Sequence, residues 1–459
     1  MKHHILFVSL MMSSLFSFAQ KENNTWYFGD KAGIDFNSGT AVPLLNSSMQ
    51  SFEGTAILSD PSGNVLFYTN GGPMKYLNYK GAVWNKNDSI MPNGILDSSA
   101  GGCNSSMQSS LIVPDPGNSN KYYIFTSDCI EHNMKGGFRY SIVDMNLDGG
   151  LGDVTVKGVP LTDSVSESIC GVVHGNTSDY WVIVHKLKSS SFYAYQINST
   201  GILPPVISNI GVSVGQYGGG QIMANMDGSK IGFPAYPKTM IFNFNKFTGV
   251  ISDSVNLNVY TTSCCFSPHG RFFYTAYGLG NKIYQFDLAA ADIPASVIEL
   301  PDTTHSSGAM QLGPDGKIYI AKKGPYINVI NLPDSLGNAC NFIESDFYLG
   351  GRNSIFGLPN FIYGRASAFH ESIGLKNNLS DLKVFPNPCG DEVTFEVEKW
   401  INDNSTVILY NSRGELVKTI ENISTDKVQM RRNDLPNGLY LYQVRINKQL
   451  IATGKLILE

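Results

Sequence analysis

The stretch MQLGPDGKIYIAK (310–322) carries the pattern that decides the fold. A short apolar run is followed by a Gly-Pro-Asp-Gly turn and then by a second apolar and aromatic run. Turn residues between two such runs predict a β-hairpin. The same order recurs at TAILSDPSGNVLFYT (55–69), SLIVPDPGNSNKYYIFT (110–126), GVVHGNTSDYWVIVH (171–185), QIMANMDGSKIGFPA (221–235) and CCFSPHGRFFYTA (264–276).

The hairpins usually continue into a third apolar run, such as SFYAYQI, MIFNFN, KIYQFDL or INVINL. The turns are spaced roughly 42 to 58 residues apart, which is the period of four-stranded propeller blades. No long window shows a helical periodicity that competes with this pattern. We therefore predict an all-β chain whose first part is a β-propeller. An array of β-sandwiches is the alternative.

The two ends of the repeat region predict how the ring closes. The segment TWYFGDKAGIDFNSGTAVPLL (25–45) supplies three strands without a leading one, and SIFGLPNFIYG (354–364) is a single strand left over. Joined, they would make a seventh blade, with its innermost strand from the end of the repeat region and three outer strands from the start. Such a joint leaves no free sheet edge. We expect seven blades within residues 20–365.

This region resembles a family of surface proteins from Bacteroidetes-type bacteria. The matching features are WYFGDKAGIDF, YYIFTSD, GGLGDV, DYWVIVHK, LGPDGKIYIA, ACNF and FGLPNF. The family is similar to WD-repeat and lactonase-like propellers in architecture alone, and a fold does not define an activity.

The N-terminus MKHHILFVSLMMSSLFSFAQ is typical of a secretory signal peptide. Lys2 precedes an apolar run that is too short to span a bilayer, and Ser17-Phe18-Ala19 is a small-x-small cleavage site. We expect residues 1–19 to be removed and the mature chain to have no transmembrane segment. The net charge of −5 and the absence of a basic block argue against nucleic-acid binding. We expect a monomer.

The C-terminal part changes character. Residues 366–378 are polar and without periodicity, as in a linker, and residues 379–459 hold about seven short strands separated by turn signals such as NSRGE and LPNGLY. This length and spacing predict a small immunoglobulin-like β-sandwich. Pro386 and Pro388 lack N–H donors, so they limit the extension of the first strand.

The segment 379–459 closely resembles the type A C-terminal sorting domain of the type IX secretion system. The resemblance rests on motifs that occur in the right order at the end of the chain: Pro386, Asn387, Pro388, Gly414, Gly438, Tyr440 and the GKLILE that contains Lys455. It implies Sec export, passage through the outer membrane with the type IX machinery as partner, and a mature protein that is released or attached to the cell surface.

The residues that begin the innermost strands of a propeller share one face with the loops between its second and third strands. Reading the repeats at these points gives a set of candidate ligand-binding residues at the channel mouth: Glu53, Gln108, Glu167, His185, His305 and Arg352. Asn70, Asp128, Tyr217 and Ser263 occupy equivalent positions. Paired carboxylates and histidines are able to perform acid–base chemistry, but polar residues are also expected wherever a channel holds water.

No nucleophile elbow, HExxH motif or phosphate-binding loop occurs. We therefore favour a noncatalytic binding or scaffolding propeller, with a glycan, a peptide or a surface protein as ligand, and assign no catalytic residue. The alternative is a hydrolase or lyase at the channel mouth that acts on a polysaccharide or a lactone.

One loop has the spacing of a calcium site, and no other cofactor is indicated. Asp144, Asn146 and Asp148 follow the D-x-N-x-D-G pattern, and Asp153 would have to replace the missing acidic residue at position 155, which is Thr155. A hairpin turn built from Asp, Asn and Gly explains the same residues without a metal ion.

Seven cysteines without a CxxC pair argue against a zinc site and against a scaffold built from disulfides. Cys103 lies in the loop that enters the second repeat, and Cys129 lies in a loop on the same face. In an exported protein these two cysteines could form a disulfide.

Overall fold

The computed structural model describes residues 21–215, 219–277, 282–301, 307–364, 382–396, 405–411, 416–423, 427–446 and 449–459. The chain divides into two compact units, residues 1–370 and 371–459, which are treated separately below. The predicted signal peptide (1–19) and the whole of the predicted linker (366–378) lie outside the described residues. Within the described part of the chain, no helix is both long and apolar enough to span a bilayer.

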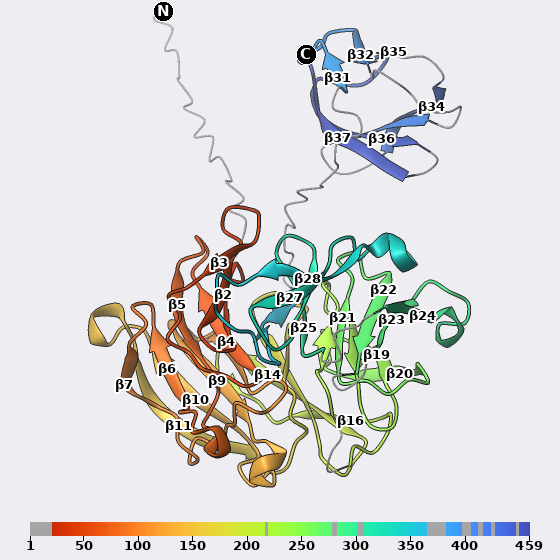
Figure 1. The fold of residues 1–459 in the computed structure, drawn as a ribbon. Helices are drawn as coiled ribbons and strands as arrows, with labels where there is room; N and C mark the ends of the chain where they lie inside the picture. The colour runs from red at the N-terminus through yellow and green to blue at the C-terminus, as the bar shows by residue number, and fades with distance from the viewer. Residues whose placement is uncertain are drawn as a thin grey trace, which may run out of the picture. The chain divides into compact units, whose positions relative to one another are not determined.

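The described part of the N-terminal unit is a succession of antiparallel sheets (Figure 1). Four of them have four strands each, in chain order. Two of these sheets are β8 (Ser110–Asp115), β9 (Asn118–Ser127), β10 (Phe138–Asp144) and β11 (Asp153–Thr162), and β17 (Met223–Ala224), β18 (Lys230–Phe233), β19 (Met240–Phe244) and β20 (Ile251–Asn256). The other two are β21 (Ser263–Phe266), β22 (Phe272–Ala276), β23 (Lys282–Asp287) and β24 (Ile298–Pro301), and β25 (Met310–Leu312), β26 (Ile318–Ile320), β27 (Tyr326–Ile330) and β28 (Phe342–Tyr348).

Three further sheets complete this description. The first has only the strands β1 (Thr25–Phe28), β2 (Ala32–Asp35) and β3 (Val42–Leu44). The second consists of β4 (Thr55–Ser59), β5 (Val65–Thr69), β6 (Ala82–Asn85) and β7 (Ile90–Ile95), and is joined by β29 (Pro359–Asn360). The third consists of β12 (Cys170–Val173), β13 (Tyr180–His185), β14 (Ser191–Asn198), β15 (Gly201–Ile202) and β16 (Val206–Asn209), and is joined by β30 (Ile362–Tyr363).

Short 3-10 helices lie in the connections between strands: η1 (Lys75–Leu77), η2 (Ile130–His132), η3 (Asp148–Gly150), η4 (Pro294–Ser296) and η5 (Gly337–Cys340). The first strands of successive sheets contact one another, from β4 to β8, β12, β17, β21 and β25. This is the propeller-like, all-β arrangement that the repeats predict.

The predicted turn chemistry explains the hairpins. In the turn between β4 and β5, Asp60 Oδ1 accepts hydrogen bonds from the backbone N–H groups of Ser62 at 2.8 Å and Asn64 at 3.0 Å. Gly63 follows with a φ of +92°, and Gly316 has a φ of +79° in the turn of the opening stretch. Glycine adopts such positive φ values without the strain that a Cβ would cause.

The prediction for the leftover strand 354–364 is wrong. It does not join β1–β3 as an innermost strand. Instead β29 pairs in parallel with β4, and β30 pairs in parallel with β12. We call residues 359–363 the central segment, because its ends lie against the innermost strands of two different sheets. The turn signals predict a strand here, but an apolar run alone does not define its partner.

The chain just before the central segment connects the first sheet of the unit (β1–β3) to its last sheet (β25–β28). The N–H of Asp30 donates to Asn353 O at 2.8 Å, and the N–H of Ala309 donates to Phe356 O at 2.7 Å. Side chains from the first sheet, the last sheet and the β4–β7 sheet share one apolar cluster, in which Trp26 is fully buried. The Trp26 ring lies 5.5 Å from the ring of Tyr319 in β26 and 6.0 Å from the ring of Phe361.

The described part of the C-terminal unit has two sheets. One contains β31 (Lys383–Phe385), β32 (Glu392–Glu396) and β35 (Lys427–Arg431); the other contains β34 (Leu416–Ile423), β33 (Ser405–Tyr410), β36 (Gly438–Ile446) and β37 (Gln449–Leu458). Side chains of both sheets, among them Phe395 and Tyr442, bury one shared core. The seven strands agree in number with those that the sequence predicts.

Candidate functional site

Two of the predicted carboxylates lie close enough to influence each other. Glu53 precedes β4 and Glu167 precedes β12, and both side chains are half-buried. Burial raises the pKa of Glu53 well above its ordinary value, and the nearby carboxylates of Glu167 and Glu131 raise it further. Burial likewise raises the pKa of Glu167 to about 8. With a pKa of about 8, the carboxyl group of Glu167 stays protonated at neutral pH and is able to donate a hydrogen bond.

Glu131, which sequence reasoning missed, completes this group. It lies in η2, and its Oε1 accepts a hydrogen bond from Ser105 Oγ at 2.8 Å. Within the described residues, its buried Oε2 has no hydrogen-bond partner. The N–H of Ile130 donates to Glu167 Oε1 at 2.5 Å, which places η2 against the loop that enters β12. The only sequence signal for Glu131 is its position two residues after Cys129.

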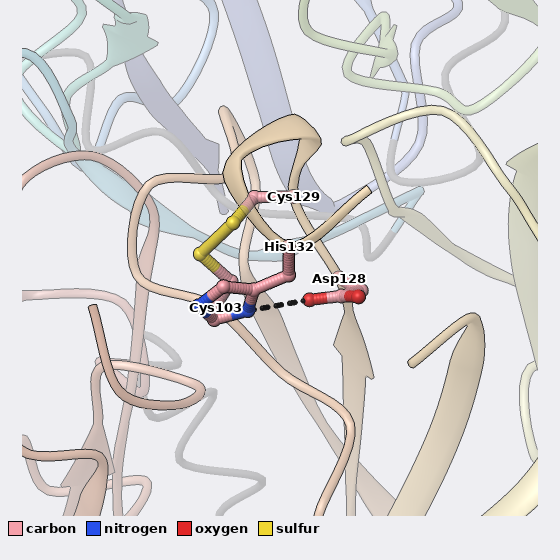
Figure 2. Close-up of side chains that lie close together, drawn as sticks. All are labelled: Cys103, Asp128, Cys129 and His132. Atoms are coloured by element: carbon pink, nitrogen blue, oxygen red, sulfur yellow. Dashed lines mark hydrogen bonds and ion pairs between the residues drawn. A yellow bond between two sulfur atoms is a disulfide. The ribbon is translucent and has the colours of Figure 1, made fainter. Parts of the chain in front are cut away.

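A disulfide fixes the start of η2. Cys103 and Cys129 are fully buried and form an S–S bond of 2.09 Å that closes a loop of 26 residues. Figure 2 shows Asp128 and His132 facing each other beside this bond, with 2.9 Å between Asp128 Oδ1 and His132 Nδ1. Their side chains and the two sulfurs form a group of potential metal ligands whose ligand atoms all lie within 4.8 Å of one another. Both sulfurs are used in the disulfide, however, and are not available as thiolate ligands.

Gln108 stabilises the centre of the unit. It is almost fully buried. Its Oε1 accepts from the N–H of Ile222 at 2.8 Å, and its Nε2 donates to Ile222 O at 3.1 Å and to Asn360 Oδ1 at 3.3 Å. The side chain expected at the channel mouth therefore satisfies buried backbone groups across the molecule.

His185 lies in the interior. Its ring is 4.6 Å from the ring of Phe192 and 4.9 Å from that of Phe233. Burial lowers the pKa of His185 to about 3, so the ring is neutral at physiological pH. Asn70 is also fully buried, and its amide bonds the backbone of Gln50, Lys80 and Ala82. Asn70 therefore stabilises the fold through its hydrogen bonds, whereas the buried Nδ1 of His185 has no hydrogen-bond partner within the described residues.

The remaining predicted positions are dispersed. Arg352 donates to Leu45 O at 2.8 Å, next to the β1–β3 sheet. Ser263 is fully buried at the start of β21. His305 and Tyr217 lie outside the described residues. Of the predicted channel-mouth residues, the structure thus brings together Glu53 and Glu167, with Asp128 near Glu167.

The central segment lies where a channel was expected. Asn360 Nδ2 donates to Ile169 O at 2.7 Å and to Ser110 O at 3.3 Å. The Tyr363 hydroxyl accepts from Gln311 Nε2 at 2.9 Å, at the first strand of the last sheet. These contacts reach the innermost strands of several sheets, so the chain itself occupies part of the space between them.

The predicted calcium loop is a hairpin turn between β10 and β11, in which Asp144 and Asp153 are directly paired. Asp144 Oδ1 accepts from the N–H of Asn146 at 3.0 Å and from its Nδ2 at 2.9 Å. Asp153 accepts from Asn93 Nδ2 at 3.2 Å, and Asp148 begins η3. The residues of the pattern thus bond neighbouring amides, and calcium binding here stays a prediction.

The predicted sorting motif joins the last strand. Asn387 Nδ2 donates to Lys455 O at 2.8 Å, and its Oδ1 accepts from the N–H of Ile457 at 2.9 Å. The motif's prolines, Pro386 and Pro388, lie on either side of Asn387, and the peptide bonds that precede them are cis. The Tyr440 hydroxyl donates to Pro436 O at 2.8 Å, just before Gly438, whose φ is +150°. Gly414 lies outside the described residues.

Several solved structures are similar to this chain at low sequence identity. The periplasmic gluconolactonase PpgL of Pseudomonas aeruginosa is 11% identical, with a TM-score of 0.37 over 77% of this chain and 94% of that chain. A putative 6-phosphogluconolactonase from Bacteroides uniformis is 10% identical, with a TM-score of 0.37 over 83% and 95%. The β-propeller domain of Cps50 (Swd1) from Myceliophteria thermophila is 8% identical, with a TM-score of 0.39 over 65% and 93%.

No curated protein sequence matches the chain. Residues 383–459 match the family model of a secretion system C-terminal sorting domain. This match covers almost the whole of the region in which the sequence motifs of a type IX sorting domain occur, including Asn387 and its partner strand. The chain therefore carries a type IX sorting domain at its C-terminal end, which implies a secreted or outer-surface-attached protein.

Proposed function

We propose that this chain is an exported binding or scaffolding protein of a Bacteroidetes-type bacterium. In this proposal a signal peptide (1–19) directs Sec export, a seven-bladed propeller (20–365) binds the ligand, and an immunoglobulin-like sandwich (379–459) addresses the chain to the type IX machinery. The match of residues 383–459 to a sorting domain is the observation that carries the export route. The three-stranded sheet β1–β3 counts as the seventh, incomplete blade.

Deleting residues 383–459 is expected to abolish export in a host that has a type IX system. The shortened chain should accumulate in the periplasm, because its N-terminal signal is intact and its outer-membrane address is gone. Fractionation followed by immunoblotting measures this. As a matched control, residues 366–459 fused to an unrelated passenger with a signal peptide should reach the surface or the medium. Export of the shortened chain at the normal level would contradict the proposal.

Two features support a binding role for the N-terminal unit. The central segment fills part of the axis, which leaves the face that holds Glu53 and Glu167 as the place for a ligand. Carboxyl groups that are protonated at neutral pH donate hydrogen bonds without attracting cations. A glycan, a peptide or a surface protein would supply acceptors for them.

The alternative is a hydrolase or lyase at the same place, acting on a polysaccharide or a lactone. The observation that favours it is the electrostatic coupling between Glu53 and Glu167, together with the pKa of about 8 for Glu167. A general acid requires a carboxyl group that keeps its proton at the working pH.

Substitution of Glu167 separates these two functions. If the protonated carboxyl group binds ligand, Glu167→Gln should keep the affinity within about threefold and Glu167→Ala should lower it about tenfold or more, the usual cost of losing a central contact. If Glu167 is a catalytic acid, Glu167→Gln should abolish turnover. Binding of the full-length protein to glycan and peptide arrays, with product analysis of the bound glycans, distinguishes the outcomes.

The pH dependence has a defined sign. Glu167 carries its proton below a pKa of about 8. Wild-type affinity should therefore be constant from pH 6 to 7 and fall as the pH rises through 8, whereas the affinity of Glu167→Gln should not change over this range. In the unfolded chain, Glu167 loses its proton near pH 4.3. Between about pH 4.3 and pH 8 the folded protein therefore holds a proton that the unfolded chain has lost, so the free energy of unfolding falls as the pH rises through this range. Equal pH profiles for both proteins would contradict the assignment.

A further inference from the structure

We infer that Tyr236, Tyr260 and Tyr277 form a binding platform for a neutral polysaccharide. This inference rests on the proposed function, because it names a place and a ligand class for the binding activity of the N-terminal unit. It does not depend on Glu53 or Glu167.

The three tyrosines come from three different connections. Tyr236 lies between β18 and β19, Tyr260 lies between β20 and β21, and Tyr277 follows β22. The rings of Tyr236 and Tyr260 are 5.2 Å apart and perpendicular, and those of Tyr260 and Tyr277 are 5.0 Å apart with 50° between their planes. Tyr236 is 57% exposed, and the other two rings are partly exposed. The three rings therefore contact one another in series, and the Tyr236 end of the series is largely open to solvent.

A buried row of hydroxyl groups supports these connections. Thr239 Oγ1 and Thr261 Oγ1 are 2.6 Å apart, and Thr261 Oγ1 and Thr275 Oγ1 are 2.5 Å apart. Thr275 Oγ1 also donates to Ser263 O at 2.7 Å. The three threonines are almost fully buried, and each lies within three residues of one tyrosine. The platform is thus pre-organised, which reduces the entropy lost when a ligand binds.

The immediate surroundings of the platform favour an uncharged ligand. The three phenol groups carry no charge at neutral pH, because the ordinary pKa of tyrosine is about 10 and burial raises the pKa of Tyr260 further. Sugar rings present C–H groups on their faces, which pack on aromatic rings, and hydroxyl groups at their edges, which bond tyrosine hydroxyls. Tyrosine supplies a rigid surface of this amphipathic kind at low entropic cost.

Affinity electrophoresis of the full-length mature protein tests this inference. The gels contain soluble β-glucan, xylan or mannan, and a parallel gel contains poly-L-proline as the competing peptide class. We expect at least one polysaccharide to retard the wild-type protein. Tyr236→Ala should weaken the apparent affinity about tenfold or more, and Tyr236→Phe should weaken it less. Phe247→Ala is the matched control, because Phe247 is 69% exposed in the turn between β19 and β20.

Unchanged melting temperatures of the variants would show that the fold is intact. Retardation by none of the three polysaccharides, retardation by poly-L-proline alone, or equal retardation of wild type and Tyr236→Ala would each overturn the inference. If Glu167→Ala abolishes ligand binding while Tyr236→Ala does not, the platform is refuted and the proposed function stands. If no variant or wild-type protein binds any ligand on the arrays, the proposed binding function fails as well.

Discussion

Replacing Trp26 by alanine is expected to destabilise the N-terminal unit by about 3–5 kcal/mol, the usual cost of removing a large, fully buried aromatic side chain. Trp26 has no exposed surface, and its ring contacts Phe36 at 4.9 Å as well as Tyr319 and Phe361. It therefore joins the first sheet to the last sheet and to the central segment. The cavity left by its removal lies at the joint between the two ends of the repeat region.

Urea unfolding followed by tryptophan fluorescence measures this effect, because Trp84 and Trp181 remain as reporters in the same unit. Tyr76→Ala is the matched control. Tyr76 is 75% exposed in η1, and its removal should change the free energy of unfolding by less than about 0.5 kcal/mol. A loss below about 1 kcal/mol for Trp26→Ala would mean that the first sheet is not part of the cooperative unit.

The repeats were predictable from sequence because each hairpin carries its own local signals. Turn residues such as Asp60 and Gly63 specify a chain reversal, and the apolar runs on both sides specify strands. The pairing of residues 359–363 was not predictable in this way. Their partners, β4 and β12, are far away in the chain, and nothing local in a two-residue strand identifies a partner.

The candidate site shows the same limit. The position of Glu53 and Glu167 before innermost strands was enough to place them near each other. The identical position of Gln108 was misleading, because an amide satisfies buried backbone groups as well as it binds a ligand, and the sequence does not distinguish the two. The platform was missed for a different reason. Its tyrosines lie in three separate connections, and only the folded chain, through the ring contacts and the threonine contacts, shows that these connections meet.

Replacing Asn360 by leucine is expected to destabilise the N-terminal unit by about 2–5 kcal/mol. The new side chain has the same branching and number of non-hydrogen atoms but no amide, so Ile169 O and Ser110 O would each lose a donor in a buried setting. Gln108 Nε2 would lose one of its acceptors. Each buried polar group without a partner costs about 1–3 kcal/mol. The effect should therefore exceed that of an ordinary surface substitution several-fold.

Asn87→Leu serves as the matched control, because Asn87 is an exposed asparagine in the turn between β6 and β7. A double-mutant cycle with Gln108→Leu makes the measurement specific. The two side chains are in contact, so their effects should not add, and a coupling of about 0.5–3 kcal/mol is expected. Additive losses would show that the central segment is held by apolar packing alone. A coupled loss would show that the hydrogen bond between Gln108 and Asn360 helps to hold the sheets together, and that these two polar side chains at the centre serve the fold.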